Sequence, residues 1–342
     1  MKKKILISRT DSIGDVVLTL PLVKALKDLE PQAEITFLCR SYTKSILEAA
    51  GISSLICLEE LESLSFAEQK KVIADFHFDI AIHVFPRRSL AKLLATAKIP
   101  VRIGTSHRWY HWLHCNQLVA MRRRQSPHHE GRLNLELLRG LDKKIDASQL
   151  DQIWTRLKQE TFLLRKTRFR EKNSSKYKVI LHPYSLGSAR EWPEAHFLQL
   201  IELLPAQSFE IFISGTKEDK KRAGNFDAKL PSHVHNVMGT MTLTEFINFI
   251  QHSDALVACS TGPLHIAAAS GICAVGLYPP LKPIDPDRWA PIGDNAHFIV
   301  KKSTCSECSF PPRCLCMEGI SPEQVALVLS NSLSNSPTKN HT

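Results

Sequence analysis

The stretch that decides the fold is CSTGPLHIAAASG at residues 259–271, which follows the apolar run ALVA at residues 255–258. An apolar run, two hydroxyl residues, Gly262 and Pro263, and then an alanine-rich segment are typical of a buried strand that turns directly into a helix. The first N–H groups of a helix lack partners within it and favour bound anions. His265 follows closely enough for its imidazole to join them. The stretch predicts an α/β protein with a site for a nucleotide or phosphorylated ligand.

Alternating strand-like and helix-like segments extend over the rest of the chain, which is typical of parallel sheets covered by helices on both faces. A helix is expected at residues 18–29, and Thr242 and Ser321 are expected to cap two later helices. The expected strands are residues 4–8, 34–40, 79–85, 101–105, 179–182, 209–214, 234–238, 255–259 and 273–278.

A chain of 342 residues suits two domains. We expect a Rossmann-like domain at residues 1–165 and a second at residues 178–333. The composition shifts to Arg, Lys, Asn and Ser between them, which predicts a linker at residues 166–177. The polar residues 334–342 are expected to form a disordered tail.

The formal charge of +10 and the pI near 9.2 favour anionic partners. The basic residues form short clusters without interleaved aromatic residues of the kind that stack bases, so no nucleic-acid partner is expected. No stretch approaches the roughly 20 apolar residues of a membrane span, and Arg9 and Asp11 follow the first apolar run at once. We therefore expect a protein without a signal peptide that stays in the cytoplasm.

Four cysteines near the end of the chain have metal-ligand spacing. Cys305, Cys308, Cys314 and Cys316 form a C-x2-C-x5-C-x-C pattern, although the second pair is closer than in zinc ribbons. A structural zinc ion, free thiols and a local disulfide all remain open. The other five cysteines have apolar neighbours and are interpreted as buried thiols.

Four segments place polar side chains where an expected strand ends, which is where open parallel sheets bind ligands. Residues 9–17 offer Asp15, with Asp11 as a second candidate acid or base. Their single glycine does not make a dinucleotide fingerprint, and no P-loop pattern occurs. Residues 182–193 offer Ser and Gly N–H groups and Arg190 for a diphosphate. Residues 213–218 offer Glu218 for ribose hydroxyls, and residues 260–265 form the fourth segment. Each residue alone also agrees with a purely structural role.

Three motifs, in this order and spacing, resemble the heptosyltransferase family of bacterial lipopolysaccharide synthesis, glycosyltransferase family 9. They are RTDSIGDVVLTLP at residues 9–21, HPYSLGSAREWP at residues 182–193 and STGPLHIAAA at residues 260–269. The resemblance continues up to the final helix through shorter matches at residues 85–89, 102–104, 239–243 and 314–317. It implies a GT-B fold, in which two Rossmann-like domains with parallel sheets face a central cleft. The first would bind the acceptor and the second an ADP-activated heptose.

The resemblance also implies roles for individual residues. Asp15 would act as the general base of an inverting transfer, provided that burial raises its proton affinity. Arg190 stands where many relatives have Lys. The donor-binding residues would be Ser185 and Arg190 at the diphosphate, Glu218 at the ribose, Met241 at the adenine, and Thr261, Gly262 and His265 at the phosphate-side helix start. Basic residues of the first domain, including Arg87, Arg88 and residues 122–124, would meet an acceptor rich in phosphate and carboxylate.

One departure concerns the donor sugar. The family commonly has Asp before the T/S-G-P segment, where this chain has Ser260. An alternative is therefore a non-catalytic or altered-specificity ADP-sugar-binding protein on the same fold. The resemblance implies no required cofactor. It implies ADP-heptose or a related nucleotide sugar as donor, an anionic lipid-linked saccharide as acceptor, and peripheral contact with the cytoplasmic face of the inner membrane.

Overall fold

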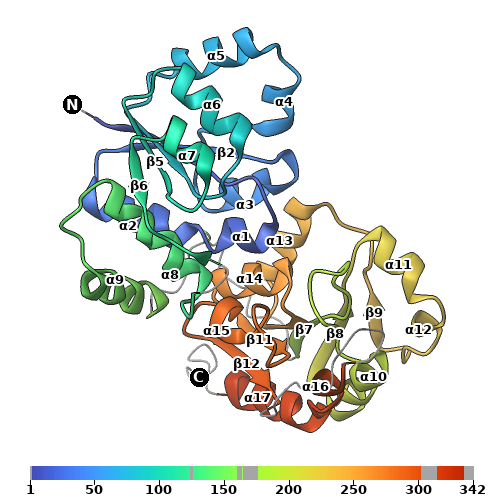
Figure 1. The fold of residues 1–342 in the computed structure, drawn as a ribbon. Coiled ribbons are helices and arrows are strands. Elements are labelled where there is room, and N and C mark those ends of the chain that lie inside the picture. The colour runs from blue at the N-terminus through green and yellow to red at the C-terminus, as the bar shows by residue number, and fades with distance from the viewer. Residues whose placement is uncertain (1, 124–125, 160–163, 165–175, 302–313, 335–342) are drawn as a thin grey trace. The chain divides into compact units, whose positions relative to one another are not determined.

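A computed structural model describes residues 2–123, 126–159, 164, 176–301 and 314–334. The chain divides into two compact units, Met1–Gln159 and Glu160–Thr342 (Figure 1). Leu164 is buried and donates its backbone N–H to the carbonyl oxygen of Ala269 in the second unit. The linker predicted at residues 166–177 and the tail predicted at 334–342 lie almost wholly outside the described residues, so both stay predictions.

The first unit contains a six-stranded parallel sheet with strand order β3-β2-β1-β4-β5-β6. Apolar residues fill the central strands because helices cover both faces of the sheet. The strands are β1 (Lys4–Ser8), β2 (Glu34–Cys39), β3 (Leu55–Cys57), β4 (Ile80–His83), β5 (Val101–Thr105) and β6 (Gln117–Val119).

The helices of the first unit follow the strands in regular alternation. They are α1 (Ile13–Val17), α2 (Leu20–Leu29), α3 (Lys44–Ala49), α4 (Leu58–Glu62), α5 (Phe66–Asp75), α6 (Arg88–Thr96), α7 (Trp109–His114), α8 (Glu130–Leu135) and α9 (Ala147–Gln159), with 3-10 turns η1 (Ser41–Thr43) and η3 (Glu136–Gly140). The helix expected at residues 18–29 begins only at Leu20. Thr19 ends the short helix α1 by donating its hydroxyl to the carbonyl oxygen of Asp15 at 2.8 Å.

The second unit repeats the architecture, with strand order β12-β11-β10-β7-β8-β9 and all neighbours parallel. Its strands are β7 (Tyr177–His182), β8 (Phe209–Ile213), β9 (Val234–Asn236), β10 (Ala255–Cys259), β11 (Cys273–Tyr278) and β12 (Ala296–Val300). Its helices are α10 (Glu194–Leu203), α11 (Lys217–Ala223), α12 (Asn225–Ala228), α13 (Leu243–Gln251), α14 (Gly262–Ala269), α15 (Pro286–Trp289), α16 (Leu315–Glu318) and α17 (Pro322–Ser334).

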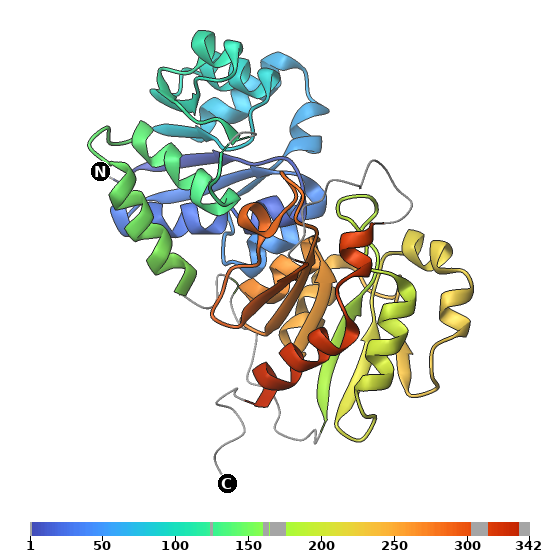
Figure 2. The ribbon, with the colours of Figure 1, turned by 60° about the horizontal axis from the view of Figure 1, so that its bottom comes forward.

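Several sequence-based expectations are confirmed. All nine expected strands are present, with ends shifted by a few residues, and Thr242 forms a capping box with Glu245 at the start of α13. Ser321 and Gln324 exchange hydrogen bonds at the start of α17. In the second unit α17 packs on α10, as Figure 2 also shows. Among the described residues, no helix has the length and apolar character needed to cross a membrane.

Candidate active site

Each sheet has one point where the strand order reverses direction. In the first unit this point lies between β1 and β4, and in the second between β7 and β10. Loops that leave the carboxyl ends of two such strands diverge to opposite faces and open a crevice for ligands. Asp15 and Arg87 follow β1 and β4, whereas Ser185 and Thr261 follow β7 and β10. The fold thus places the predicted site residues at the ligand-binding edge of each sheet.

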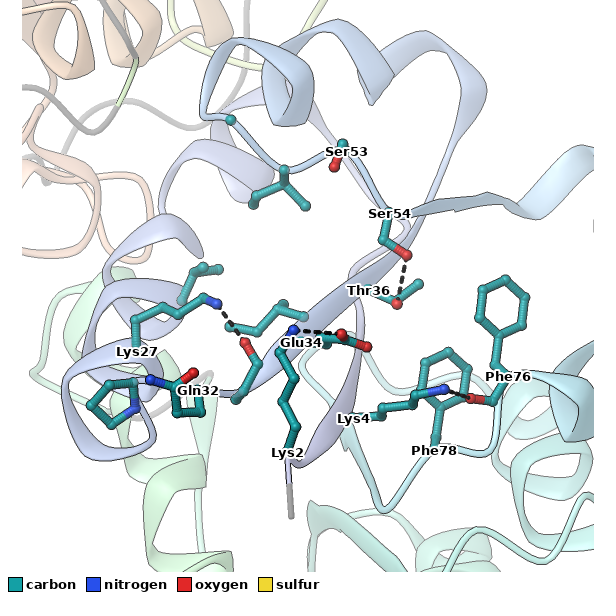
Figure 3. Close-up of a pocket in the computed structure, with 16 residues that line it drawn as sticks. Lys2, Lys4, Lys27, Gln32, Glu34, Thr36, Ser53, Ser54, Phe76 and Phe78 are labelled. Carbon is teal, nitrogen blue, oxygen red and sulfur yellow. Dashed lines mark hydrogen bonds and ion pairs between the residues drawn. The ribbon is translucent and has the colours of Figure 1, made fainter.

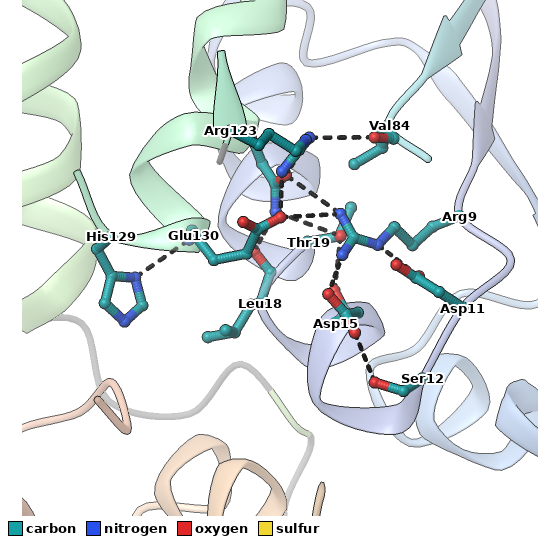
Figure 4. Close-up of polar contacts among 12 residues, drawn as sticks. Arg9, Asp11, Ser12, Asp15, Leu18, Thr19, Val84, Arg123, His129 and Glu130 are labelled. Carbon is teal, nitrogen blue, oxygen red and sulfur yellow. Dashed lines mark hydrogen bonds and ion pairs between the residues drawn. The ribbon is translucent and has the colours of Figure 1, made fainter. Parts of the chain in front are cut away.

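Asp15 belongs to a buried charge network around Arg9 (Figure 4). The Arg9 side chain is only 2% exposed. Its Nε donates to Asp11 Oδ1 at 2.7 Å, its Nη2 donates to Asp15 Oδ1, and its Nη1 lies 3.3 Å from Glu130 Oε1. Ser12 Oγ donates to the second Asp15 oxygen at 2.5 Å. Both oxygens of Asp15 are therefore held in place, while 17% of its side chain stays exposed.

A second arginine closes the network from the other side. Arg123 pairs with Glu130 Oε1 and donates to Asn134 Oδ1 at 2.9 Å and to the Val84 carbonyl oxygen at 3.0 Å. The Asn134 amide in turn donates to the Leu18 carbonyl oxygen at 2.8 Å. The acceptor contact expected of residues 122–124 stays a prediction, and Arg123 also has these partners within the first unit. Two guanidinium groups thus face three carboxylates.

The buried position of Asp11 beside a second carboxylate affects its pKa. Burial raises the pKa of Asp11 from 3.8 to about 6; Arg9 opposes this rise, and the Asp15 carboxylate adds to it. Conversely, the pKa of Arg9 is raised: burial lowers it, but Asp15, Asp11 and Glu130 together outweigh that effect. Near neutral pH the network therefore sits close to the point at which Asp11 takes up a proton.

This raised pKa predicts a pH-dependent effect of the substitution Asp11→Asn. The folded protein holds the Asp11 proton up to about pH 6, whereas an unfolded chain releases it near pH 4, so the stability contributed by Asp11 is lost as the pH rises through that window. We expect the stability of the variant relative to the unsubstituted protein to rise between pH 4 and pH 7. Hydrogen exchange during urea unfolding at both pH values, followed on peptides from β1 and α8, measures the difference for the first unit alone. An equal difference at both would contradict the raised pKa.

The two arginines predicted to contact the acceptor follow β4 and have partners within the first unit. Arg87 precedes α6 and lies 3.6 Å from Glu62, with part of its side chain exposed. Arg88 is exposed, and its guanidinium lies 4.9 Å from the centre of the Trp109 ring. These contacts lie outside the Arg9 network, and the role of both arginines at the acceptor stays a prediction.

In the second unit, the loop after β7 is organised by Glu191. The Ser185 N–H and hydroxyl both donate to Glu191 Oε1, at 2.8 and 2.9 Å. Arg222 on α11 donates from Nη1 to the same oxygen at 2.9 Å and pairs with the other. The pKa of Glu191 is lowered: burial raises it, but hydrogen bonds from Arg222 and Ser185 outweigh burial. Ser185 is therefore a fixed part of the loop.

Arg190 differs from Arg222 in having no acidic partner among the described residues. It is half-buried, and it makes no ion pair within the described part of the chain. Leu186 and Gly187 just before it have positive φ values of 49° and 83°, which turn the loop tightly. A half-buried guanidinium without a carboxylate partner is suited to an anionic ligand.

The loops after β8 and β9 are joined to each other at the same sheet edge. The Gly239 N–H donates to the Gly215 carbonyl oxygen at 2.9 Å, and Gly239 has φ of 71° with the Lys217 backbone close to it. This close approach brings the segments that carry Glu218 and Met241 together. Glu218 is exposed in the first turn of α11, and Met241 is half-buried.

The start of α14 has the backbone that the opening sequence stretch predicts. Thr261 is extended at the N-cap, Gly262 and Pro263 begin the helix, and His265 is buried. The Thr261 hydroxyl is buried and has no hydrogen-bond partner among the described residues. Buried polar atoms normally have a partner, so this hydroxyl is available to a ligand.

Ser260 is engaged beside this helix start. Burial raises the pKa of the Tyr278 hydroxyl, and a side-chain hydrogen bond with Ser260 acts in the opposite direction. The same hydroxyl donates to the Trp289 carbonyl oxygen at 2.5 Å. Ser260 thereby takes part in the contacts between the end of β11 and α15.

The predicted zinc site remains untested, because Cys305 and Cys308 lie outside the described residues. Cys314 precedes α16, and Cys316 is buried within it. Among the residues that the structure describes, no three His, Cys, Asp or Glu side chains group as metal ligands.

A cavity of about 580 Å³ lies at the opposite end of β1 from Asp15 (Figure 3). Three lysines line it, and each is engaged. Lys2 pairs with Glu34 at 2.7 Å, Lys4 donates to the Phe76 carbonyl oxygen at 3.2 Å, and Lys27 donates to the Ala33 carbonyl oxygen at 2.5 Å. These contacts connect the strand ends to the neighbouring loops, and each of the three lysines thus has a structural role there.

Comparison of the sequence with known proteins identifies its relatives. The sequence profile of glycosyltransferase family 9 (heptosyltransferase) matches residues 68–313. A protein of Haemophilus influenzae that is provisionally named a glycosyltransferase is 27% identical over 304 residues, 85% of this chain and 87% of its own. The lipopolysaccharide core heptosyltransferase OpsX of the same organism is 22% identical over 90% of this chain and 88% of its own.

Solved structures agree with the observed fold. The ADP-heptose lipopolysaccharide heptosyltransferase II of Escherichia coli has a TM-score of 0.76 at 20% identity, covering 97% of this chain and 98% of that one. The E. coli heptosyltransferase WaaC, solved with ADP, has a TM-score of 0.70 at 17% identity over 96% and 99%. The fold, with its two parallel six-stranded sheets, is therefore the GT-B fold of these structures. The profile match over most of the sequence shows that the chain belongs to glycosyltransferase family 9, the heptosyltransferases.

Proposed function

We propose that this glycosyltransferase transfers a heptose from ADP-heptose to an anionic saccharide of the lipopolysaccharide inner core, with inversion at the anomeric carbon. The observation that carries the proposal is the Asp15 carboxylate, held by Arg9 and Ser12 at the ligand-binding edge of the first sheet. The donor is supported by WaaC, which was solved with ADP-2-deoxy-2-fluoro heptose.

The proposed reaction is a single displacement. Asp15 accepts the proton of an acceptor hydroxyl while that oxygen bonds to the anomeric carbon. The bond from this carbon to the diphosphate oxygen breaks on the opposite face, and ADP leaves with the electron pair. A fixed carboxylate suits this role because a general base must be aimed at the hydroxyl before the reaction begins. The Arg9 and Ser12 contacts supply this orientation.

The second unit is proposed to bind the donor. Arg190, which has no carboxylate partner among the described residues, and the N–H groups at the start of α14 would neutralise the departing diphosphate, as fixed donors do where negative charge develops. The buried Thr261 hydroxyl would donate to the same ligand. Glu218 would bind the ribose and Met241 would lie at the adenine. Because Arg190 and the helix start already provide positive charge, the proposed transfer needs no metal ion.

Replacing Arg190 with Ala is expected to weaken ADP binding about 10- to 100-fold, the range for losing a charged hydrogen bond. Isothermal titration calorimetry with ADP measures this directly. Arg190→Lys should restore part of the affinity, since it keeps the charge but loses the planar donor pair. The exposed Lys221 on α11 provides the control, and Lys221→Ala should leave affinity unchanged. Equal affinities for Arg190→Ala and the control would remove Arg190 from the donor site.

The transfer itself is tested with purified protein, ADP-heptose and an inner-core acceptor, by following ADP release and the mass of the product. Release of ADP together with a product one heptose heavier supports the proposal. Binding of ADP without any transfer would favour the alternative of a non-catalytic binding protein. Transfer from another ADP-sugar only would correct the donor, and Ser260 is the residue at which we expect such a difference to arise.

A further inference from the structure

Helix α7 has its apolar side chains on the outside. Trp109, Trp112 and Leu113 are 60%, 65% and 69% exposed, whereas His111 is completely buried. Residues three and four apart share one face of a helix, so the three large apolar side chains form a single outward stripe. The inward His111 ring packs 5.3 Å from His83 of β4. The packing of the first unit therefore does not account for the apolar face of α7.

Cations lie next to this stripe on α6 and at the start of α7. Arg88 stacks on Trp109 at 4.9 Å, and Arg108 at the start of α7 is exposed. Helix α6 packs beside α7 (Figure 1). Its Lys92 lies 5.4 Å from the ring centre of the half-exposed Phe66 of α5. We call these residues the α7 patch: Phe66, Arg88, Lys92, Arg108, Trp109, Trp112 and Leu113.

The charged residues in the sequence around α7 are all positive. Between Ile80 and His129 the chain has nine Lys and Arg residues and no Asp or Glu. The net charge of the whole protein is +10, so this window carries most of it. Arg87 and Arg123 pair with Glu62 and Glu130, which lie outside the window. Among the described residues the three cations beside α7, Arg88, Lys92 and Arg108, make no ion pair, and they keep their positive potential.

Exposed Trp and Leu side chains with cations beside them match the chemistry of an anionic bilayer surface. Tryptophan favours the boundary between headgroups and acyl chains, leucine enters the apolar layer, and Arg and Lys are attracted to anionic headgroups. A second copy of the chain would bring like charges together, which opposes association. We propose that the α7 patch docks the first unit on a bilayer containing anionic lipid.

Vesicle sedimentation tests the docking in the absence of donor and acceptor. A negative result for docking is therefore distinguishable from a negative result for the proposed transfer. The protein is mixed with phosphatidylcholine vesicles containing about one third phosphatidylglycerol, and with phosphatidylcholine vesicles alone. We expect binding to the anionic vesicles that weakens as salt is raised, because surface charges are screened. Equal binding to both vesicle types, or binding to neither, would overturn the proposal.

Two variants test whether binding occurs through α7. Leu113→Glu places a negative charge in the stripe without removing a hydrogen bond, and it should weaken binding to anionic vesicles at least about tenfold. Leu327→Glu on α17 of the second unit is the matched control, since Leu327 is 61% exposed, and binding should fall much less. Equal losses in the two variants would overturn the assignment to α7.

Tryptophan fluorescence gives a second measurement on the intact fold. Brominated lipid should quench the unsubstituted protein, and Trp109→Phe with Trp112→Phe should remove most of this quenching. Light scattering tests the alternative that the α7 patch binds a second copy of the chain, because it measures the molecular mass in solution. Two results together would overturn bilayer docking: the unsubstituted protein is a dimer that Leu113→Glu dissociates, and brominated lipid does not quench its fluorescence. The partner of the α7 patch would then be a second copy of the chain.

Discussion

Replacing Asp15 with Asn is expected to lower kcat by about 10²- to 10⁴-fold, the usual contribution of a general base. The amide has the shape of the carboxylate but cannot accept the acceptor proton at neutral pH. The KM for the donor and the Kd for ADP should change little, because the proposed donor residues belong to the second unit. Initial rates of ADP release with saturating acceptor measure the effect, and calorimetry with ADP confirms that the donor site is intact.

The control for this experiment is Asp28→Asn on α2. Asp28 also pairs with an arginine, Arg156, but both side chains are substantially exposed. Its rate should match that of the unsubstituted protein. If Asp15→Asn keeps more than about one tenth of kcat, Asp15 is not the base. Asp11 would then be the next carboxylate to test, since it contacts the same arginine.

Replacing Arg9 with Met should destabilise the first unit by about 3–5 kcal/mol, the range observed when one partner of a buried ion pair is removed. Methionine fills much of the same volume but leaves the three carboxylates of Asp11, Asp15 and Glu130 without their shared cation. Because the chain has two units, a single unfolding curve would mix them. Hydrogen exchange during urea unfolding, read on peptides from β1 and α8, reports the first unit alone.

Two further variants separate charge from packing in this result. Arg9→Lys keeps the positive charge but cannot reach three carboxylates with a planar fork, so its loss should be intermediate. Arg156→Met removes the exposed partner of Asp28 and should cost less than about 1 kcal/mol. A loss for Arg9→Met that is no larger than for Arg156→Met would mean that the network contributes little to stability.

The strand pattern was largely predictable because the central strands are buried on both faces and their sequences are continuous apolar runs. The strands that sequence reasoning missed are β3, β6 and β12. The first two have three residues each, and β12 is at a sheet edge with no fully buried residue. Short or exposed strands lack the apolar run that identifies a parallel strand, so their pairing becomes visible only in the sheet.

The candidate site was predictable only in part. The motif residues lie in loops after strands, and their position follows from the alternation of strands and helices. The partners of these residues could not be predicted in this way, because Glu130 is 121 residues from Arg9 and Arg222 is 31 residues from Glu191. No local spacing relates such residues. The charge of Arg123 suggested an exposed basic cluster, whereas burial of Glu130 draws this arginine into the unit.

The pairing of Arg9 with Glu130 and Asn134 also affects when the turn after β1 can become ordered. Glu130 at the start of α8 lies 121 residues after Arg9 in the sequence, and α8 must dock before this arginine is fully paired. Contacts between residues so far apart in sequence form late, because a long loop must close first. We therefore expect β1 to gain protection from solvent before Asp15 is locked in place, so that refolding chains acquire a sheet before they acquire activity.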